Sequence, residues 1–478
     1  MGLSGLLLLN VTFLALGVGV IGLFRAAGNW ADLVAKLGLA YLTGVCIAGL
    51  AAAELAIANV SIGPVTLALV AASVLVAGLV RFARGLAPAA PLEEARLWGS
   101  RVIGVAALLQ TGLLLGVAGT AFAVRPFWEW DGWAIWGFKA RALYALGGVS
   151  NPAFESHVYA HHMQDYPLFL PALEATAFRA LGGVDERLVH LQLLGLAVGF
   201  VGALWALLRP RVPMELLGLS ILALVAAPGM LDTLAANYAD VPLAIFVALG
   251  LVALARWLLD SEPRMLGWAV LFLACGTLTK NEGALFAGAG LVAAFLVASR
   301  RKPLLIAAVA TFLPLVPWRV FVALHHIHDP ALRPRDLRPG ALAQHTDRIG
   351  PAASRLLREL VFTQHGLLVP MTLVALFAAI TAGRKRIALF ALTWLSVSFA
   401  GLVVVYWASR LPLDWYLATS APRIVLSLVI GGAALAPLLA GDAWKQSLAE
   451  LRAQKGLYTS TSIPTPISTT PSNSDGSA

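Results

Sequence analysis

The amino-acid sequence predicts an all-α polytopic membrane protein with about 13 transmembrane helices. The first observation is composition: 59% of the 478 residues are hydrophobic and only 12% are charged, where a soluble domain has roughly 25% charged residues. The second is that apolar runs of about 18 or more residues recur along most of the chain. These runs are continuous rather than alternating, and lipid requires internally satisfied backbones, so they indicate helices and not a β-barrel.

Thirteen segments carry this pattern, with boundaries uncertain by several residues. The two at 266–280 and 283–299 are short enough to be re-entrant or tilted. The approximate limits are 3–24, 33–57, 62–80, 103–124, 186–208, 214–231, 241–258, 266–280, 283–299, 303–325, 367–383, 387–408 and 421–440.

The basic residues predict the orientation. Alternate gaps between apolar runs are rich in Arg and Lys, which marks the cytoplasmic side and leaves the N-terminus outside and the C-terminus in the cytoplasm. The net charge of +9 is therefore read as a topology signal and not as a nucleic-acid surface. The basic gaps contain Arg25 and Lys36; Arg81, Arg84, Arg96 and Arg101; Arg209 and Arg211; Arg256 and Arg264; Arg300, Arg301 and Lys302; and Arg384, Lys385 and Arg386.

Two long loops fall on the opposite, outer side. The first, about 125–185, contains an expected amphipathic helix from Gly132 to Leu146 and an apolar piece from Tyr166, which we expect to lie in the membrane interface. The second, about 326–366, departs from the positive-inside trend, which suggests bound anions or a folded loop. Its arginines are Arg333, Arg335, Arg338, Arg348, Arg355 and Arg358.

The stretch FWEWDGWAIWGFKARALY, from Phe127 to Tyr144, is the most informative part of the first loop. Carboxylates cost free energy beside a membrane, so Glu129 and Asp131 require a reason at this position. Tryptophans favour the headgroup level. The segment therefore predicts a polar, reactive pocket at one face of a bilayer. The tryptophans serve as an interfacial belt or, alternatively, as a platform for sugar or isoprenoid: they are Trp128, Trp130, Trp133 and Trp136.

Several stretches, in order, resemble GT-C glycosyltransferases, and the protein O-mannosyltransferase and lipid A aminoarabinose transferase group in particular. Asp131 stands where that family keeps an acidic residue in its first long outer loop. The other matching stretches are DYPLFLPALEATAFRALGGVDERLVHL, in which Leu168 replaces a family proline; ANYADVPLAIF from Ala236; ACGTLTKNEGALF from Ala274; Val316 to Arg319; and WYLATSAPRIVLSL from Trp415.

The resemblance covers roughly 103–440 and implies a domain organisation and an activity. Residues 1–100 would be a three-helix N-terminal extension, 101–442 a catalytic core, and 443–478 a cytoplasmic low-complexity tail. The implied activity is transfer of a monosaccharide from a polyprenyl-phosphate donor to a lipid, glycan or protein acceptor of the cell envelope, with inversion. The implied location is the outer side of the bacterial cytoplasmic membrane.

Three carboxylates are the catalytic candidates. An inverting transfer needs a base to take the proton of the acceptor hydroxyl, and Asp131 is expected in that role; the alternative is a helix N-cap. Glu129 is expected as a second acid or a solvated loop residue. Asp165 is expected in the same site, or as a turn-initiating residue before Pro167.

Cations at the ends of apolar runs are expected to bind the donor phosphate, because a charge there is costly and usually functional. Lys280 and Arg319 are the first candidates and Arg423 a weaker one, with snorkelling to the headgroups as the alternative. No cofactor is expected, although His161, His162 and Asp165 offer a low-ranked divalent metal site. Further substrate or lipid contacts are expected from Trp130, Trp133, Tyr166, His162, Asp240 and Glu282.

Two other function classes fit part of the sequence. A lipid or solute transporter or flippase would explain many spans and intramembrane cations, but it predicts repeated halves and polar residues at mid-bilayer. A non-catalytic GT-C-like assembly subunit would keep the fold without the activity, and only an activity measurement separates it from an enzyme.

Overall fold

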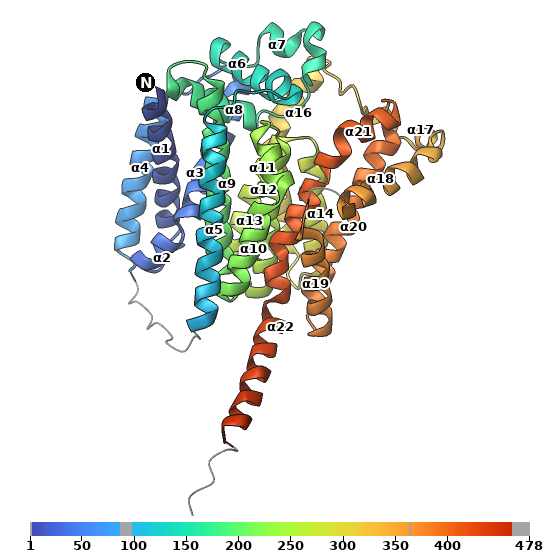
Figure 1. The fold of residues 1–478 in the computed structure, drawn as a ribbon. Coiled ribbons are helices and arrows are strands. Elements are labelled where there is room, and N and C mark those ends of the chain that lie inside the picture. Colours follow the sequence, from blue (N-terminus) through green and yellow to red (C-terminus); the bar gives the residue numbers. More distant parts are fainter. Residues whose placement is uncertain (1, 87–97, 363–364, 461–478) are drawn as a thin grey trace, which may run out of the picture.

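The computed structural model describes residues 2–86, 98–362 and 365–460. Within these residues every regular element is helical, which confirms the all-α polytopic prediction. Long helices run side by side, and shorter ones lie across one end of the bundle, at the top of Figure 1. We call this end, which carries residues 125–185 and 326–362, the loop face.

Every predicted apolar segment corresponds to a helix or a bent helix pair. By length and composition, eight helical stretches in the described residues can cross a membrane, and ten if each bent pair counts as one span. The eight are α1 (Gly2–Leu23), α3 (Leu37–Ile57), α4 (Pro64–Ala83), most of α5 (Trp98–Phe122), α9 (Glu186–Leu208), α12 (Asp240–Asp260), α20 (Lys385–Ala408) and the stretch Leu413–Lys445 formed by α21 (Leu413–Ile424) and α22 (Leu426–Ser460).

The remaining apolar segments are bent or short. The bent pairs are α10 (Met214–Ala226) with α11 (Pro228–Ala235), at 49°, and α15 (Lys302–Phe312) with α16 (Leu315–Leu324), at 45°. Prolines stand at these breaks because proline lacks an N–H for the preceding turn. The short apolar helices are α13 (Pro263–Thr279), α14 (Glu282–Val297) and α19 (Leu368–Thr381). Helix α22 continues to Ser460, so residues 443–460 of the predicted low-complexity tail are helical, and the rest of that tail lies outside the described residues.

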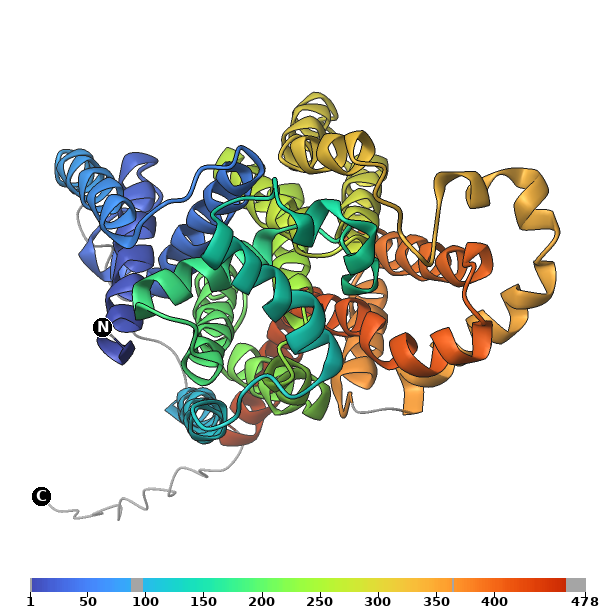
Figure 2. The same ribbon diagram turned by 90° about the horizontal axis from the view of Figure 1, so that it is seen from above.

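The N-terminal helices pack closely on the rest of the bundle, as Figures 1 and 2 show at the blue end. A Cβ atom at Gly17 would lie 1.7 Å from the Ala40 carbonyl oxygen, so only glycine permits this approach of α1 and α3. The short helix α2 (Trp30–Ala35) joins them and is capped by Asn29.

A polar triad ties this N-terminal unit to the core. The Tyr41 hydroxyl donates to Asn10 Oδ1 at 2.6 Å, and Gln192 of α9 donates to the Tyr41 oxygen at 3.1 Å. Asn10 donates in turn to Gln192 Oε1 at 3.1 Å. Three amide and hydroxyl groups thus satisfy one another among apolar helices, where unpaired polar groups are costly.

Helix α12 is the centre of the bundle, since its whole apolar window is buried. Its first residue, Asp240, lies at the loop face, and its last, Asp260, lies at the opposite end. The loop face itself is built from a π-helical turn (Asp131–Trp136), α6 (Gly137–Leu146), α7 (Pro152–Glu155), a 3₁₀ turn (His157–His162), α8 (Phe169–Leu181), a second 3₁₀ turn (Pro334–Leu337), α17 (Pro339–Ala343), a third (Thr346–Arg348) and α18 (Ile349–Phe362).

Three expectations about the loops can be compared with the structure. The helix expected from Gly132 to Leu146 exists as the π-helical turn followed by α6. The apolar piece after Tyr166 is the short helix α8, which is buried almost throughout against α3, α6 and α1, and its expected place in the membrane interface stays a prediction. The second loop is a folded one, since Arg348 donates to the Ser409 and Leu411 carbonyls.

Candidate active site

A cavity of about 630 Å³ lies at the loop face, and we call it the main cavity. Segments far apart in the sequence form its wall: the π-helical turn, the turn between α13 and α14, the loop after α16, the end of α20, and α21. Polar groups gather on one part of the wall, and apolar side chains such as Leu285 and Val405 cover another. The predicted residues that line it are Trp130, Asp131, Tyr166, Lys280, Glu282 and Arg423.

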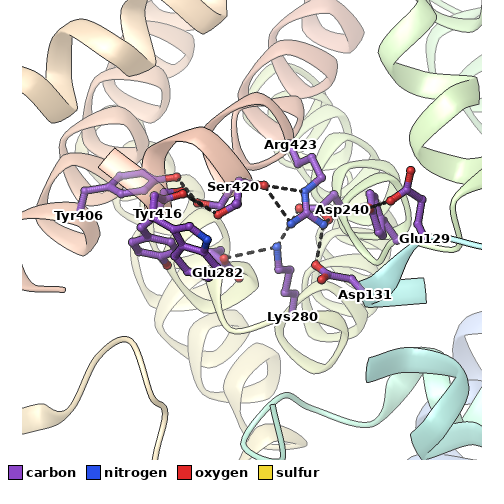
Figure 3. A network of polar contacts seen from close by, with 12 residues as sticks. Glu129, Asp131, Asp240, Lys280, Glu282, Tyr406, Tyr416, Ser420 and Arg423 are labelled. Atoms are coloured by element: carbon purple, nitrogen blue, oxygen red, sulfur yellow. Dashed lines mark hydrogen bonds and ion pairs between the residues drawn. The ribbon is translucent and has the colours of Figure 1, made fainter. Parts of the chain in front are cut away.

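Arg423 occupies the middle of the polar wall (Figure 3). Its Nη1 lies 2.6 Å from Asp131 Oδ2 and 3.9 Å from Asp240 Oδ2. Its guanidinium also stacks over the Tyr238 ring, 4.3 Å from the centroid. One planar cation thus joins the end of α21 to the π-helical turn and to α12, and it holds the Asp131 carboxylate at the cavity wall.

Lys280 is the second cation of the wall. Its ammonium donates to Asp240 Oδ1 at 2.8 Å and lies 3.5 Å from Glu282 Oε1. Lys280 is extended between α13 and α14, in a turn that needs close packing. A Cβ atom at Gly283 would lie 1.9 Å from the Gly276 carbonyl oxygen, so glycine permits the turn. The start of α14 therefore faces the cavity, which favours negative charge there.

A second polar chain runs behind the main cavity. Arg319 donates to Asn281 Oδ1 at 2.7 Å, and Asn281 donates to Asp165 Oδ2 at 2.6 Å. Burial raises the pKa of Asp165 above its ordinary value, and Lys139, Asn281 and Arg319 oppose that shift. Asn281 lines the cavity, whereas Arg319 and Asp165 do not, so both reach it through that amide.

Buried groups fix the turn that carries Asp165. The Trp318 indole donates to the Asp165 carbonyl at 2.9 Å. Lys139, which is 1% exposed, donates to the carbonyls of Met163 and Tyr166. Burial lowers the pKa of Lys139 to about 7, although the nearby Asp165 carboxylate favours its charged form.

Several predicted residues lie away from the cavity. Glu129 accepts a hydrogen bond from the Tyr238 hydroxyl at 3.0 Å and does not line the cavity. His162 is buried, bonded to the Ala134 carbonyl and stacked on Phe138, and its neighbour His161 lines the cavity instead. Trp133 packs edge-on against Trp130 but is not part of the wall.

The tryptophans divide into two groups. Trp128, Trp130 and Trp133 are 55%, 54% and 38% exposed, as an interfacial belt would be. Trp136 is buried and stacks on Tyr166 at 5.5 Å between ring centroids, so it supports the site rather than the membrane contact.

Sequence reasoning missed or underrated three residues. Arg423, in the last predicted span, was the weaker candidate among the cations, yet it contacts two carboxylates, Asp131 and Asp240. Asn281 carries no charge and gave no signal except its place in the TKNE turn. Asp329 lines the cavity from the second loop, and burial raises its pKa to about 7. Within the described residues no group of three or more His, Cys, Asp or Glu side chains is arranged to hold a metal ion.

One comparison with known proteins identifies the family of this region. The family model described as dolichyl-phosphate-mannose-protein mannosyltransferase matches residues 165–321, about a third of the chain. This match supports a GT-C superfamily glycosyltransferase. The matched segment supplies Asp165, Asp240, Lys280 and Arg319. Comparisons with curated proteins and with solved structures found no match.

Proposed function

We propose that this protein transfers a monosaccharide from a polyprenyl-phosphate donor to a cell-envelope acceptor, with inversion at the anomeric carbon. The reaction would take place on the outer side of the bacterial cytoplasmic membrane, at the loop face. The observation that carries this proposal is one cavity whose wall contains the Asp131 carboxylate, paired with Arg423, and a second cation, Lys280.

The chemistry follows from this arrangement. The acceptor hydroxyl oxygen attacks the anomeric carbon while the bond from that carbon to the phosphate oxygen breaks. Asp131 takes the hydroxyl proton as general base. The electron pair of the broken bond remains on the departing lipid phosphate, and Lys280 and Arg423 stabilise that charge. Leu285 and Val405 come from apolar helices, so they suit the isoprenoid chain.

The ion pairs of Lys280 and Arg423 indicate what each cation does when the donor binds. In the free protein Lys280 and Arg423 are shared among Asp131, Asp240 and Glu282. A donor phosphate gives Arg423 a new partner, which frees the Asp131 carboxylate to act as a base. Arg319 acts indirectly, because its hydrogen bond holds the Asn281 amide at the cavity wall.

The test uses the purified full chain in lipid with polyprenyl-phosphate sugars, and it follows release of polyprenyl phosphate by thin-layer chromatography. Mass spectrometry of envelope glycans from a deletion strain identifies the sugar and the acceptor. We expect a missing glycosyl group in the strain and donor consumption in vitro. Unchanged glycans together with intact donor would reject the proposal.

The orientation has its own test. A cysteine placed at the exposed Ser150 should react with an impermeant maleimide added outside the cell, and one at Ser460 should not. Cys46 and Cys275 are both buried, so the background is low. The opposite labelling pattern would place the cavity in the cytoplasm and remove the outer-side acceptor.

A further inference from the structure

A second cavity, of about 210 Å³, lies behind Arg423. It sits between α11, α18, α21 and the start of α22, and Arg423 lines both this cavity and the main one. At about 30 Å³ for each water in the liquid, it has room for about seven waters, the scale of a single sugar ring. Its polar lining consists of Thr233, Arg355, Glu359, His365 and Arg423.

His365 is the residue that points to a ligand. It is 3% exposed, and both of its ring nitrogens lack a hydrogen-bond partner among the residues that the structure describes. Buried polar side chains are nearly always paired, because leaving one unpaired costs free energy. Burial also lowers the pKa of His365, so the neutral ring presents one donor and one acceptor to the cavity.

The charges of the second cavity cancel in pairs. Arg355 Nη2 lies 2.6 Å from Glu359 Oε1. Arg423 is paired with Asp131 and, at longer range, with Asp240. A neutral group with several hydroxyls would find directional donors and acceptors in His365, Thr233 and the ion pair.

The second cavity shares one lining residue with a groove on the surface. A groove of about 320 Å³ between α18 and α21 shares Arg355 with it and includes Ser354, Arg358 and Asp414. Arg355 and Arg423 thus stand at the two ends of the second cavity, one toward the groove and one toward Asp131. The polar lining of the second cavity and the groove differs from the main cavity, whose apolar wall suits a lipid.

We propose that the second cavity binds a neutral sugar ring, and that in catalysis this ring belongs to the acceptor. The assignment to the acceptor rests on the proposed function, but the binding of the ring does not. His365 and Thr233 would hydrogen-bond ring hydroxyls. Until the donor binds in the main cavity, Arg423 would stand between that cavity and the bound ring.

The test measures binding of simple methyl pyranosides, beginning with methyl α-mannopyranoside, to the full chain in nanodiscs by saturation-transfer NMR. We expect His365→Leu to weaken binding about tenfold, the loss of two neutral hydrogen bonds. Thr233→Val, which keeps shape, should weaken it several-fold. His345→Leu is the matched control, because that histidine is exposed and outside the cavity.

Two additions identify the source of the ring. Polyprenyl phosphate alone should leave the pyranoside signal unchanged, because it occupies the main cavity. Polyprenyl-phosphate mannose should also leave it unchanged if the ring is the acceptor's, and displacement would assign the cavity to the donor sugar and overturn the acceptor assignment. Equal binding in wild type, His365→Leu and Thr233→Val, or no binding of any pyranoside, would overturn the site itself. These experiments measure sugar binding and not transfer. They therefore test the second cavity even if the protein shows no transferase activity.

Discussion

Helix α12 has an aspartate at each end, and each lies between two cations. At the loop face, Asp240 contacts Lys280 and Arg423. At the opposite end, Asp260 contacts Arg256 and Arg211. The residue types are nearly the same, but Lys280 and Arg423 line the main cavity, whereas Asp260, Arg256 and Arg211 line neither of the two cavities described above.

The difference lies in what else the cations touch. Arg256 also donates to the Leu207 carbonyl, so its guanidinium joins α12 to α9 within the protein. The helix dipole adds to this, because cations are favoured at the end of α12 and a carboxylate at its start. The cluster around Asp260 therefore holds α12 and α9 together, and we call this structural role the staple. Lys280 and Arg423, in contrast, keep a side toward the cavity, where a ligand can replace a carboxylate partner.

Asp131→Asn should have the largest effect in this comparison. Loss of a general base typically slows a reaction about two to four orders of magnitude, and the amide cannot accept a proton at neutral pH. Asp260→Asn, at the other cluster, should retain transfer per folded molecule. Transfer assays on both variants, normalised to folded protein, make the comparison. Activity of Asp131→Asn within a few-fold of wild type would leave Asp131 a structural cap.

Arg256→Met should have the next largest effect, on stability. The side chains of Arg256 and Asp260 are 8% and 13% exposed, and removing one partner of a buried pair costs about 3 kcal/mol or more. Thermal unfolding in detergent should show a clearly lower midpoint with unchanged activity at low temperature. A midpoint equal to that of wild type would contradict the staple.

Lys280→Met should weaken binding of the lipid donor about 10- to 100-fold, the loss of one charge-assisted contact worth roughly 1.5–3 kcal/mol. Arg211→Met is the control at the other end of α12 and should bind donor normally. A titration of labelled polyprenyl-phosphate sugar measures both. Because Arg319 does not line the cavity, Arg319→Met should have a smaller effect than Lys280→Met, and the reverse order would move the phosphate site.

Asp329→Asn should have the smallest effect, on the pH dependence of stability. The pKa of Asp329 is raised to about 7 by burial, against about 3.9 in an unfolded chain. Between these values the folded protein binds more protons, so this group makes stability fall as pH rises from about 4 to 7. Asn removes that contribution. Unfolding midpoints at pH 5 and 7.5 should differ less in the variant than in wild type.

The structure brings together several residues that the sequence singled out as charges at the ends of apolar runs, and their roles stay predictions. Asp131, Lys280, Glu282 and Arg423 stand at such ends, and all line one cavity. The sequence had less to offer for Asn281 and His365. An uncharged amide and a loop histidine look ordinary until the fold shows the first bridging Asp165 to Arg319 and the second buried without a partner.

Composition alone determined that the chain is a helical membrane protein. In lipid the backbone N–H and C=O groups of each span must form their hydrogen bonds within that span. The alternation of basic gaps gave the expected sides, and the ends of the apolar runs gave the charged candidates. Only the tertiary structure decided which charges meet, because ion pairs such as Arg423 with Asp131 join residues almost 300 positions apart. It also decided that α8 is buried and that Arg423 separates two cavities, since both depend on how the helices pack and not on the pattern of any one helix.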